Sequence, residues 1–289
     1  MSALPCTLVG GWLGAGKTTL VNALLRQAPP RRLAVLVNDF GSAGIDASLV
    51  EGATGRVLEL AGGCICCSYG ADLLGTVQQV LQRQPRPDAL LLETSGVADP
   101  AAVVRSLRLL AGVQPDGTVV VVDAQRLAEL RSDPYVGDTV RAQLDSADLL
   151  VLNKADLVDT DTLNELRRTL PAVPVVDAVQ GQVPIDVLLG LPAGAHPSPL
   201  AGPAAQRFVS RSADMPAPQD VDTIARRLTQ AGSGVLRAKG LLTATDGRRL
   251  LLQVVGRQAQ LSPAPPGASG PDRLAVIGLR GLYDGAPWS

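Results

Sequence analysis

Aromatic residues are scarce in this chain, making up only 2% of its 289 residues. The hydrophobic fraction is nevertheless 46%, so the core must be built mainly from Leu, Val, Ala and Ile, and a wholly disordered chain is excluded. No stretch of about 18 consecutive apolar residues occurs, which excludes a membrane-spanning helix. The length predicts about two domains, at roughly 150 residues each.

Net charge and cysteine are low as well. The 26 basic and 27 acidic residues leave a net charge of −1, so no overall field would attract nucleic acid or an anionic membrane. Four cysteines are too few for a disulfide scaffold. The opening residues, MSALPCTLVGG, lack a basic stretch followed by an apolar run and a cleavage site. We therefore expect no signal peptide and a reducing, cytoplasmic setting.

Lysine and glutamate are rare among the charged residues. Only three of the 26 basic residues are Lys, at positions 17, 154 and 239, and only five of the 27 acidic residues are Glu. A motif that requires either residue type is therefore hard to produce by chance.

Short apolar runs alternate with segments of helical periodicity through the first domain. The pattern predicts strands at 4–10, 33–38, 56–60, 88–95, 118–124 and 148–156, and helices at 18–27, 72–84 and 100–111. The strands are apolar almost throughout, which is typical of a parallel sheet covered on both faces. The expected fold class is α/β, with a doubly wound, mostly parallel sheet.

A second, smaller domain is predicted after a Pro-, Gly- and Ala-rich stretch at 191–205, which indicates a linker. A strand at 207–213, a helix at 219–231, a hairpin around Asp246 and Gly247, and a strand at 273–279 indicate an α+β domain with a mostly antiparallel sheet. Residues 256–272 are expected to form a loose loop. The expected domain bounds are 1–190, with 191–205 as linker, and 206–289.

The segment GWLGAGKTT follows the first predicted strand and matches G-x-x-x-x-G-K-[ST]. Its glycines let backbone N–H groups face phosphate oxygens, and the helix that begins near Lys17 adds its positive end. Lys17 is expected to contact the β- and γ-phosphates, and the Thr18 hydroxyl to coordinate Mg²⁺. The candidate phosphate-binding residues are Gly11, Gly14, Ala15, Gly16, Lys17, Thr18 and Thr19.

The tetrapeptide NKAD, at 153–156, follows another predicted strand. Asp156 can accept two hydrogen bonds from guanine N1–H and N2–H₂, a donor pair that adenine lacks. Asn153 can hold the N7 edge, and the stem of Lys154 can cover the face of the base. GTP is therefore favoured over ATP, and the α/β domain is expected to be a P-loop GTPase domain.

Acidic residues at other strand ends are further candidates. In ETSG (93–96), Glu93 could hold a Mg²⁺-bound water or orient the attacking water, and the N–H of Gly96 could sense the γ-phosphate. Lys17 and Glu93 are thus the candidate catalytic residues. Asp123 ends the strand at 118–124 and is interpreted as structural, with a functional role left open. Asp39, in NDFG, could contact Mg²⁺, complete a metal site or only cap a turn.

The segment GGCICCS places Cys64, Cys66 and Cys67 within four positions, after two glycines that indicate a loop. Thiolates bind Zn²⁺, Cu(I) and similar ions, and an incomplete, open ligand set suits metal transfer. Redox chemistry and simple packing are the alternatives. Cys6, in the first strand, is expected to be a small buried hydrophobe. His196, the only histidine, is expected to be solvated.

With GWLGAGKTT, NDFGSAGID, ELAGGCICCS, ETSGVADP and LNKADL together, the chain resembles the CobW-type family of P-loop GTPases over residues 5 to about 190. GVLRAKGLL resembles the family's C-terminal module. The resemblance implies a metallochaperone that couples Mg²⁺–GTP binding to capture of a transition metal, hydrolyses GTP slowly and passes the metal to a client protein.

For this chain the expected metal is Zn²⁺ or Co²⁺, the expected client is a metalloprotein, and a nucleotide-dependent homodimer is a further expectation. No nucleic acid or membrane partner is expected. Family members usually carry Glu where Asp39 and Ser42 stand here. A non-catalytic, GTP-bound zinc sensor or buffer and a small-molecule kinase remain as alternatives, and the use of ATP by kinases of this fold speaks against the kinase.

Overall fold

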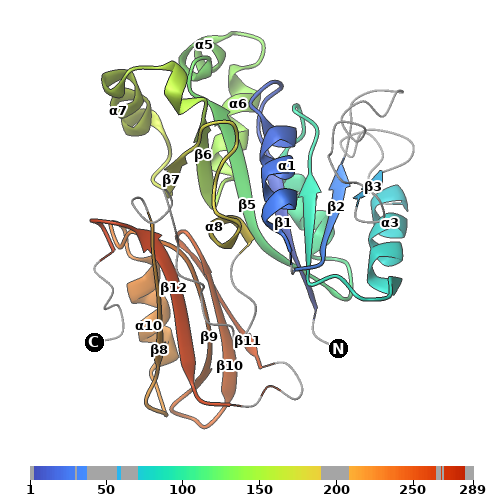
Figure 1. The fold of residues 1–289 in the computed structure, drawn as a ribbon, viewed down its shortest axis with the longest axis vertical. Helices are drawn as coiled ribbons and strands as arrows, with labels where there is room; N and C mark the ends of the chain where they lie inside the picture. Colours follow the sequence, from blue (N-terminus) through green and yellow to red (C-terminus); the bar gives the residue numbers. More distant parts are fainter. Residues whose placement is uncertain are drawn as a thin grey trace. The chain divides into compact units, whose positions relative to one another are not determined.

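The structure of the chain is a computed structural model that describes residues 3–29, 31–37, 57–59, 71–189, 208–264, 268 and 270–283. It divides into two compact units, residues 3–183 and the residues from Pro184 onward (Figure 1). None of the described helices has the length and apolar character needed to cross a bilayer.

The first unit is built on a parallel sheet whose described strands follow the order β3-β2-β4-β1-β5-β6-β7 (Figure 1). The strands are β1 (Leu4–Gly10), β2 (Leu33–Val37), β3 (Val57–Glu59), β4 (Ala89–Glu93), β5 (Val113–Asp123), β6 (Leu149–Asn153) and β7 (Val175–Asp177). Every residue of β2 and β6 is buried, which requires cover on both faces of the sheet.

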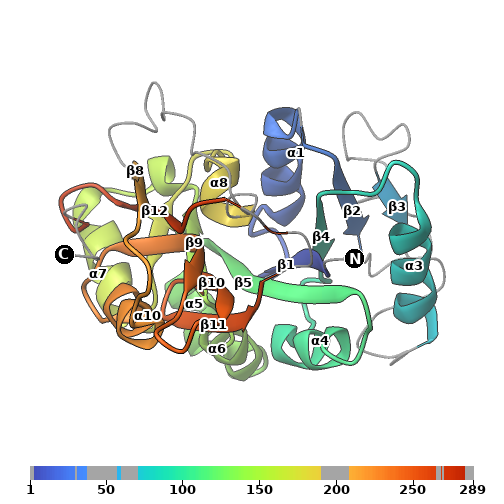
Figure 2. The same ribbon diagram turned by 90° about the horizontal axis from the view of Figure 1, so that it is seen from below.

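Helices supply that cover. They are α1 (Lys17–Gln27), α3 (Ala71–Gln82), α4 (Pro100–Leu107), α5 (Leu127–Ser132), α6 (Gly137–Asp145) and α7 (Thr160–Thr169), with a 3₁₀ turn, η1 (Ala155–Leu157). α1 lies on one face of the sheet, and α4 and α6 lie on the other (Figure 2). The prediction of a doubly wound α/β domain is therefore confirmed.

Cys6 lies within the core that β1 forms with α3 and α4, and it is 1% exposed. Burial is the larger cause, and the negative charge of Asp116 the smaller, of a rise in the pKa of the Cys6 thiol to about 12. Since the thiolate is the reactive and metal-binding form, this thiol stays protonated and inert at neutral pH. Cys6 is thus the small buried hydrophobe that the sequence predicts.

The sheet brings the ends of its strands together. All the pairings are parallel, so the carboxyl ends of the strands meet at one edge. The register pairs Val9 with Glu93 and Asp123 with Asn153. The loop that leaves β1 is therefore flanked by the ends of β4 and β5, and β6 ends directly beside β5.

The second unit has an antiparallel sheet whose described strands follow the order β11-β10-β9-β12-β8. Its elements are α8 (Ile185–Leu189), β8 (Phe208–Asp214), α10 (Val221–Thr229), β9 (Val235–Thr243), β10 (Arg249–Val255), β11 (Gln258–Pro263) and β12 (Arg273–Leu279). α10 packs Ile224 and Leu228 against one face of the sheet. The prediction of a smaller α+β domain is confirmed.

Two charged side chains, Asp220 and Arg237, bond backbone groups at the ends of helices in this unit. Asp220 precedes α10 and accepts a hydrogen bond from the Thr223 N–H at 3.0 Å, and the bonds from the Thr223 side chain and backbone lower the pKa of Asp220. Arg237, 3% exposed on β9, donates from Nε to the Val187 carbonyl oxygen at 3.1 Å and also bonds the Leu188 carbonyl oxygen. It thereby satisfies carbonyl groups at the end of α8 that the helix itself leaves open.

The prediction of a loose loop over 256–272 is wrong for its first part. β11 pairs with β10 from Gln258 opposite Val255 to Pro263 opposite Leu250. It is an edge strand whose first three residues are exposed, so it lacks the apolar alternation by which strands are recognised in a sequence. The predicted linker at 191–205 lies outside the described residues.

Candidate functional site

The loop between β1 and α1 has left-handed backbone at three glycines, with φ of +129° at Gly11, +76° at Gly14 and +98° at Gly16. Gly16 directly precedes α1. Because glycine has no side chain with which to cap the helix, the first N–H groups of α1 can face an anion. This geometry suits the phosphate-binding role predicted for residues 11–19.

Lys17 is 8% exposed, and its ammonium group bonds back to the loop that precedes it. Nζ donates to the carbonyl oxygens of Gly11, at 3.0 Å, and Trp12, at 3.3 Å. The positive charge is therefore held inside the loop, where the oxygens of a bound phosphate would approach it.

Thr18 and Glu93, 75 residues apart in the sequence, are brought into contact at the edge of the sheet. The Thr18 hydroxyl donates to Glu93 Oε1 at 3.0 Å, and Glu93 is 2% exposed. Hydroxyl, carboxylate and phosphate oxygens are the ligands that Mg²⁺ prefers, together with water. The donor set at this point therefore fits Mg²⁺.

Asn153 lies at the end of β6 and connects two loops. Its Nδ2 donates to the Ala15 carbonyl oxygen at 2.9 Å, and its Oδ1 accepts from the Gly181 N–H at 3.0 Å. The side chain thus ties the phosphate loop to the loop that follows β7, a role that the sequence did not reveal. An amide nitrogen carries two hydrogens, so this role is compatible with a contact to a base.

Lys154 follows in a left-handed conformation, with φ of 59°. Its Nζ lies 2.6 Å from Asp123 Oδ2, and Asp123 Oδ1 accepts from the Gln125 N–H at 2.9 Å. Asp156 lies two residues further on, exposed in η1. The sequence left the role of Asp123 open, and the structure places it in contact with the lysine of NKAD.

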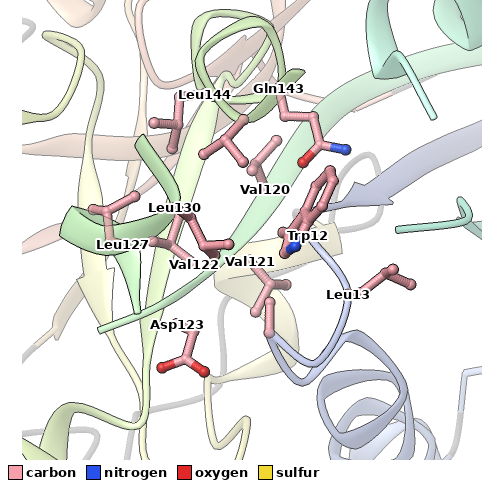
Figure 3. Close-up of a pocket in the computed structure, with 12 residues that line it drawn as sticks. Trp12, Leu13, Val120, Val121, Val122, Asp123, Leu127, Leu130, Gln143 and Leu144 are labelled. Atoms are coloured by element: carbon pink, nitrogen blue, oxygen red, sulfur yellow. The ribbon is translucent and has the colours of Figure 1, made fainter. Parts of the chain in front are cut away.

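The segment after β4 is held from two sides. A side chain at Gly96 would collide with Leu13 of the phosphate loop, so only a glycine permits this approach. Gln143, 2% exposed on α6, donates Nε2 to the carbonyl oxygens of Gly96 and Ala98, each at 3.0 Å. Figure 3 shows Gln143 at a small, mostly apolar pocket that Trp12 and Leu13 also line. A single glutamine on an amphipathic helix carries no sequence signal for this role.

The cysteine site predicted at Cys64, Cys66 and Cys67 lies outside the described residues, as do Asp39 and His196. Within the described part of the chain, no group of three or more His, Cys, Asp or Glu side chains is arranged to hold a metal ion. The cysteine site therefore stays a prediction.

Replacing Gly16 by Ala is expected to weaken GTP binding at least about tenfold while the chain still folds. A Cβ at this position would collide with Asn153 Nδ2, the atom that bonds Ala15, and φ of +98° is itself strained for an L side chain. That strain costs about 1–2 kcal/mol, the hydrogen bond contributes about 1 kcal/mol, and about 1.4 kcal/mol corresponds to tenfold in affinity. Calorimetric titration with GTP measures the loss.

Gly247→Ala is the matched control for this substitution. Gly247 has φ of +82° and no atom within 4 Å of an added Cβ, and it lies in the turn between β9 and β10. Parental GTP affinity is expected for Gly247→Ala. An equal loss in the two variants would contradict the role assigned to Gly16.

A parallel sheet with a glycine-rich phosphate loop after its first strand and N-K-x-D at the end of β6 defines a P-loop protein of the GTPase class. The model of the CobW/HypB/UreG nucleotide-binding domain matches residues 5–177. The model of the cobalamin synthesis protein cobW C-terminal domain matches residues 208–283. The chain belongs to the CobW/HypB/UreG family, in the form that carries the CobW C-terminal domain.

Similar proteins include two described as zinc chaperone CobW. The one from Pseudomonas aeruginosa is 36% identical over 232 residues, which cover 68% of this chain and 62% of that protein. The one from Sinorhizobium sp is 29% identical over an alignment of 338 positions, covering 98% of this chain and 95% of that protein. A Zn(II)-bound triple mutant of the YjiA GTPase has a similar fold, with a TM-score of 0.50 and 23% identity over 97% of this chain and 95% of that one.

Proposed function

We propose that this chain is a GTP-hydrolysing metallochaperone. It binds Mg²⁺–GTP at the carboxyl edge of the parallel sheet, captures Zn²⁺ or Co²⁺ through Cys64, Cys66 and Cys67, and passes the ion to a client metalloprotein. The observation that carries the proposal is the contact of Thr18 with Glu93 at 3.0 Å, since Thr18 directly follows Lys17 in the phosphate loop. The zinc chaperones among the similar proteins support zinc as the cargo.

Guanine selection follows from the segment after β6. Asp156 is exposed in η1, where its carboxylate can accept hydrogen bonds from N1–H and N2–H₂ of guanine. Adenine has no such donor pair, so its binding would leave the carboxylate unpaired. The stem of Lys154 covers one face of the base.

In hydrolysis, Lys17 exchanges the carbonyl oxygens of Gly11 and Trp12 for the β- and γ-phosphate oxygens. A water oxygen bonds to the γ-phosphorus, and the bond from that phosphorus to the oxygen that bridges it to the β-phosphate breaks. The water gives a proton to an oxygen of the phosphate that forms, and GDP and phosphate leave. Lys17 stabilises the negative charge that develops on the phosphates, and Glu93 holds the water network beside Thr18. Mg²⁺, when bound at Thr18 and Glu93, supplies further charge neutralisation.

Nucleotide and metal binding are coupled in this proposal. In this proposal GTP orders the segments 38–46 and 62–68 together, which assembles the thiolate site, and hydrolysis loosens the segments and releases the metal. Coupling of two binding equilibria is reciprocal, so the metal tightens GTP binding by the same factor. A nucleotide-dependent homodimer is part of the same proposal.

Metal titration in the presence of a GTP analogue and then of GDP tests the coupling. We expect the parent chain to bind Zn²⁺ more tightly with the GTP analogue by roughly 1–3 kcal/mol, the usual range of an allosteric coupling. Competition with a chromophoric chelator measures both affinities. Equal affinity with the two nucleotides would instead support a non-catalytic zinc sensor or buffer, whereas metal-stimulated GTP turnover would argue against one.

A further inference from the structure

We infer that Asp123 is a positioning residue for guanine. Its carboxylate holds the ammonium group of Lys154, so that the lysine stem forms one wall of the base site before the nucleotide arrives. The inference rests on the proposed GTP binding at residues 153–156, and it assigns to the end of β5 a role in the choice of base.

The contact between the two side chains is close and largely shielded. Lys154 Nζ lies 2.6 Å from Asp123 Oδ2, and the side chains are 32% and 5% exposed, respectively. Asp123 Oδ1 accepts from the Gln125 N–H at 2.9 Å, so the carboxylate is oriented by the backbone that follows β5. A shielded ion pair with a fixed acceptor restrains a lysine far more than an exposed pair does.

The backbone sets the distance between the two groups. Asp123 and Asn153 are paired in the register of β5 and β6, and the Ala124 N–H bonds the Asn153 carbonyl oxygen at 3.0 Å. Lys154 comes directly after this pair with φ of 59°, a conformation that few non-glycine residues adopt. The bend turns the chain at the end of the sheet, and the lysine side chain reaches back to β5.

Restraining Lys154 in advance affects base binding because lysine has many rotamers. A free lysine stem loses this freedom when it is laid against a base, and the loss corresponds to roughly tenfold in affinity. Where Asp123 has already ordered the stem, this entropy is lost when the chain folds. Nucleotide binding is then tighter by the same factor of roughly ten. The gain applies only to a nucleotide whose base is held against Lys154. Asp156 bonds guanine in that position and finds no donor pair on adenine, so GTP gains the affinity and ATP does not.

Asp123→Asn tests the assignment, because asparagine keeps the shape and the acceptor for Gln125 but has no charge to hold Lys154. We expect GTP affinity to fall roughly tenfold and ATP affinity to stay unchanged, so that the preference for GTP falls by the same factor. In a Lys154→Met background, Asp123→Asn should cause no further loss, since the pair is already broken.

Asp138→Asn, at a carboxylate that is 96% exposed, is the matched control and should bind like the parent. Equal losses for GTP and ATP, or additive effects of the two changes, would overturn the inference.

A second measurement is made on the parent chain, with Lys154→Met used only to assign the signal, and it does not depend on how Asp123→Asn folds. With three lysines in the chain, ¹⁵N-lysine labelling gives at most three ammonium signals, and the signal lost in Lys154→Met identifies Lys154. In the nucleotide-free parent, the Lys154 ammonium protons are expected to exchange with water at least tenfold more slowly than those of free lysine. Exchange at the rate of free lysine would show that Asp123 does not hold Lys154, and the inference would fall.

The parent's own base preference separates this inference from the proposed function. If the parent binds GTP and ATP equally, the guanine proposal fails and the inference fails with it. If the parent prefers GTP and Asp123→Asn retains that preference in full, only the role of Asp123 is wrong.

Discussion

Replacing Lys17 by Ala is expected to lower kcat for GTP hydrolysis by about 10²–10³-fold, the usual effect of removing one group that stabilises developing charge. The ammonium group bonds two carbonyl oxygens of its own loop and is not part of the apolar core. Alanine is the best helix former, so α1 should still begin at this position. Steady-state release of phosphate from Mg²⁺–GTP, measured over a range of GTP concentrations, gives kcat and KM.

Lys239→Ala is the control for the same type of substitution, since Lys239 lies on β9 in the second unit. Parental turnover is expected for this variant. A Lys17→Ala chain with an unchanged kcat and a raised KM would show that the lysine binds substrate and transition state equally. Hydrolysis at the parental rate and KM would place the activity at another site.

The double change Cys66→Ser/Cys67→Ser is expected to weaken Zn²⁺ binding by more than about 10²-fold, because residues that only orient a ligand are already worth about 10–100-fold in metal affinity. Serine keeps the size of cysteine but does not ionise near neutral pH as a metal-bound thiol does. GTP affinity without metal should stay nearly parental, and any stimulation of hydrolysis by metal should be lost. Competition with a chromophoric chelator measures the metal affinity.

Cys6→Ala is the control in which a cysteine outside the proposed metal site is removed. Cys6 is buried in the core of the first unit with its pKa raised to about 12, so its removal should leave metal affinity unchanged. Parental metal affinity in the double variant would show that the site is not formed by these cysteines. Asp39 and His196 would then be the next ligands to test.

Strands with continuous apolar runs could be predicted closely. The predicted strands at 4–10 and 273–279 coincide with β1 (Leu4–Gly10) and β12 (Arg273–Leu279). Both strands are buried on two faces, so their apolar residues are consecutive in the sequence. Such a run can be recognised without knowledge of the partner strand.

Strand segments that form only because a neighbouring strand pairs with them could not be predicted. β5 begins at Val113, five residues before the predicted strand, and this first part contains Pro115 and Gly117. β1 supplies the hydrogen-bonding partners of these residues, with a register shift between Cys6 and Thr7. β11 depends in the same way on β10, because an exposed edge strand has little local preference and forms where a neighbour offers free N–H and C=O groups.

Candidate site residues could be identified from the sequence wherever they lie within one short segment. Residues 11–19, 93–96 and 153–156 each contain the residues proposed for phosphate, Mg²⁺ or base binding within a few consecutive positions, and a rare Lys or Glu marks each segment. The loop conformation needed at each segment follows from its own glycines and from the strand before it. The cysteine segment at 62–68 is of the same local kind, and its metal site stays a prediction.

Which of these residues come into contact depends on the tertiary structure. Asn153 reaches Ala15 across 138 positions, Thr18 reaches Glu93 across 75, and Lys154 reaches Asp123 across 31. These contacts depend on the strand order and register of the sheet, which place the ends of β4 and β5 on either side of β1 and the end of β6 beside β5. A local pattern carries no information about strand order, because the same apolar runs would suit several arrangements. Packing of the whole core selects one of them.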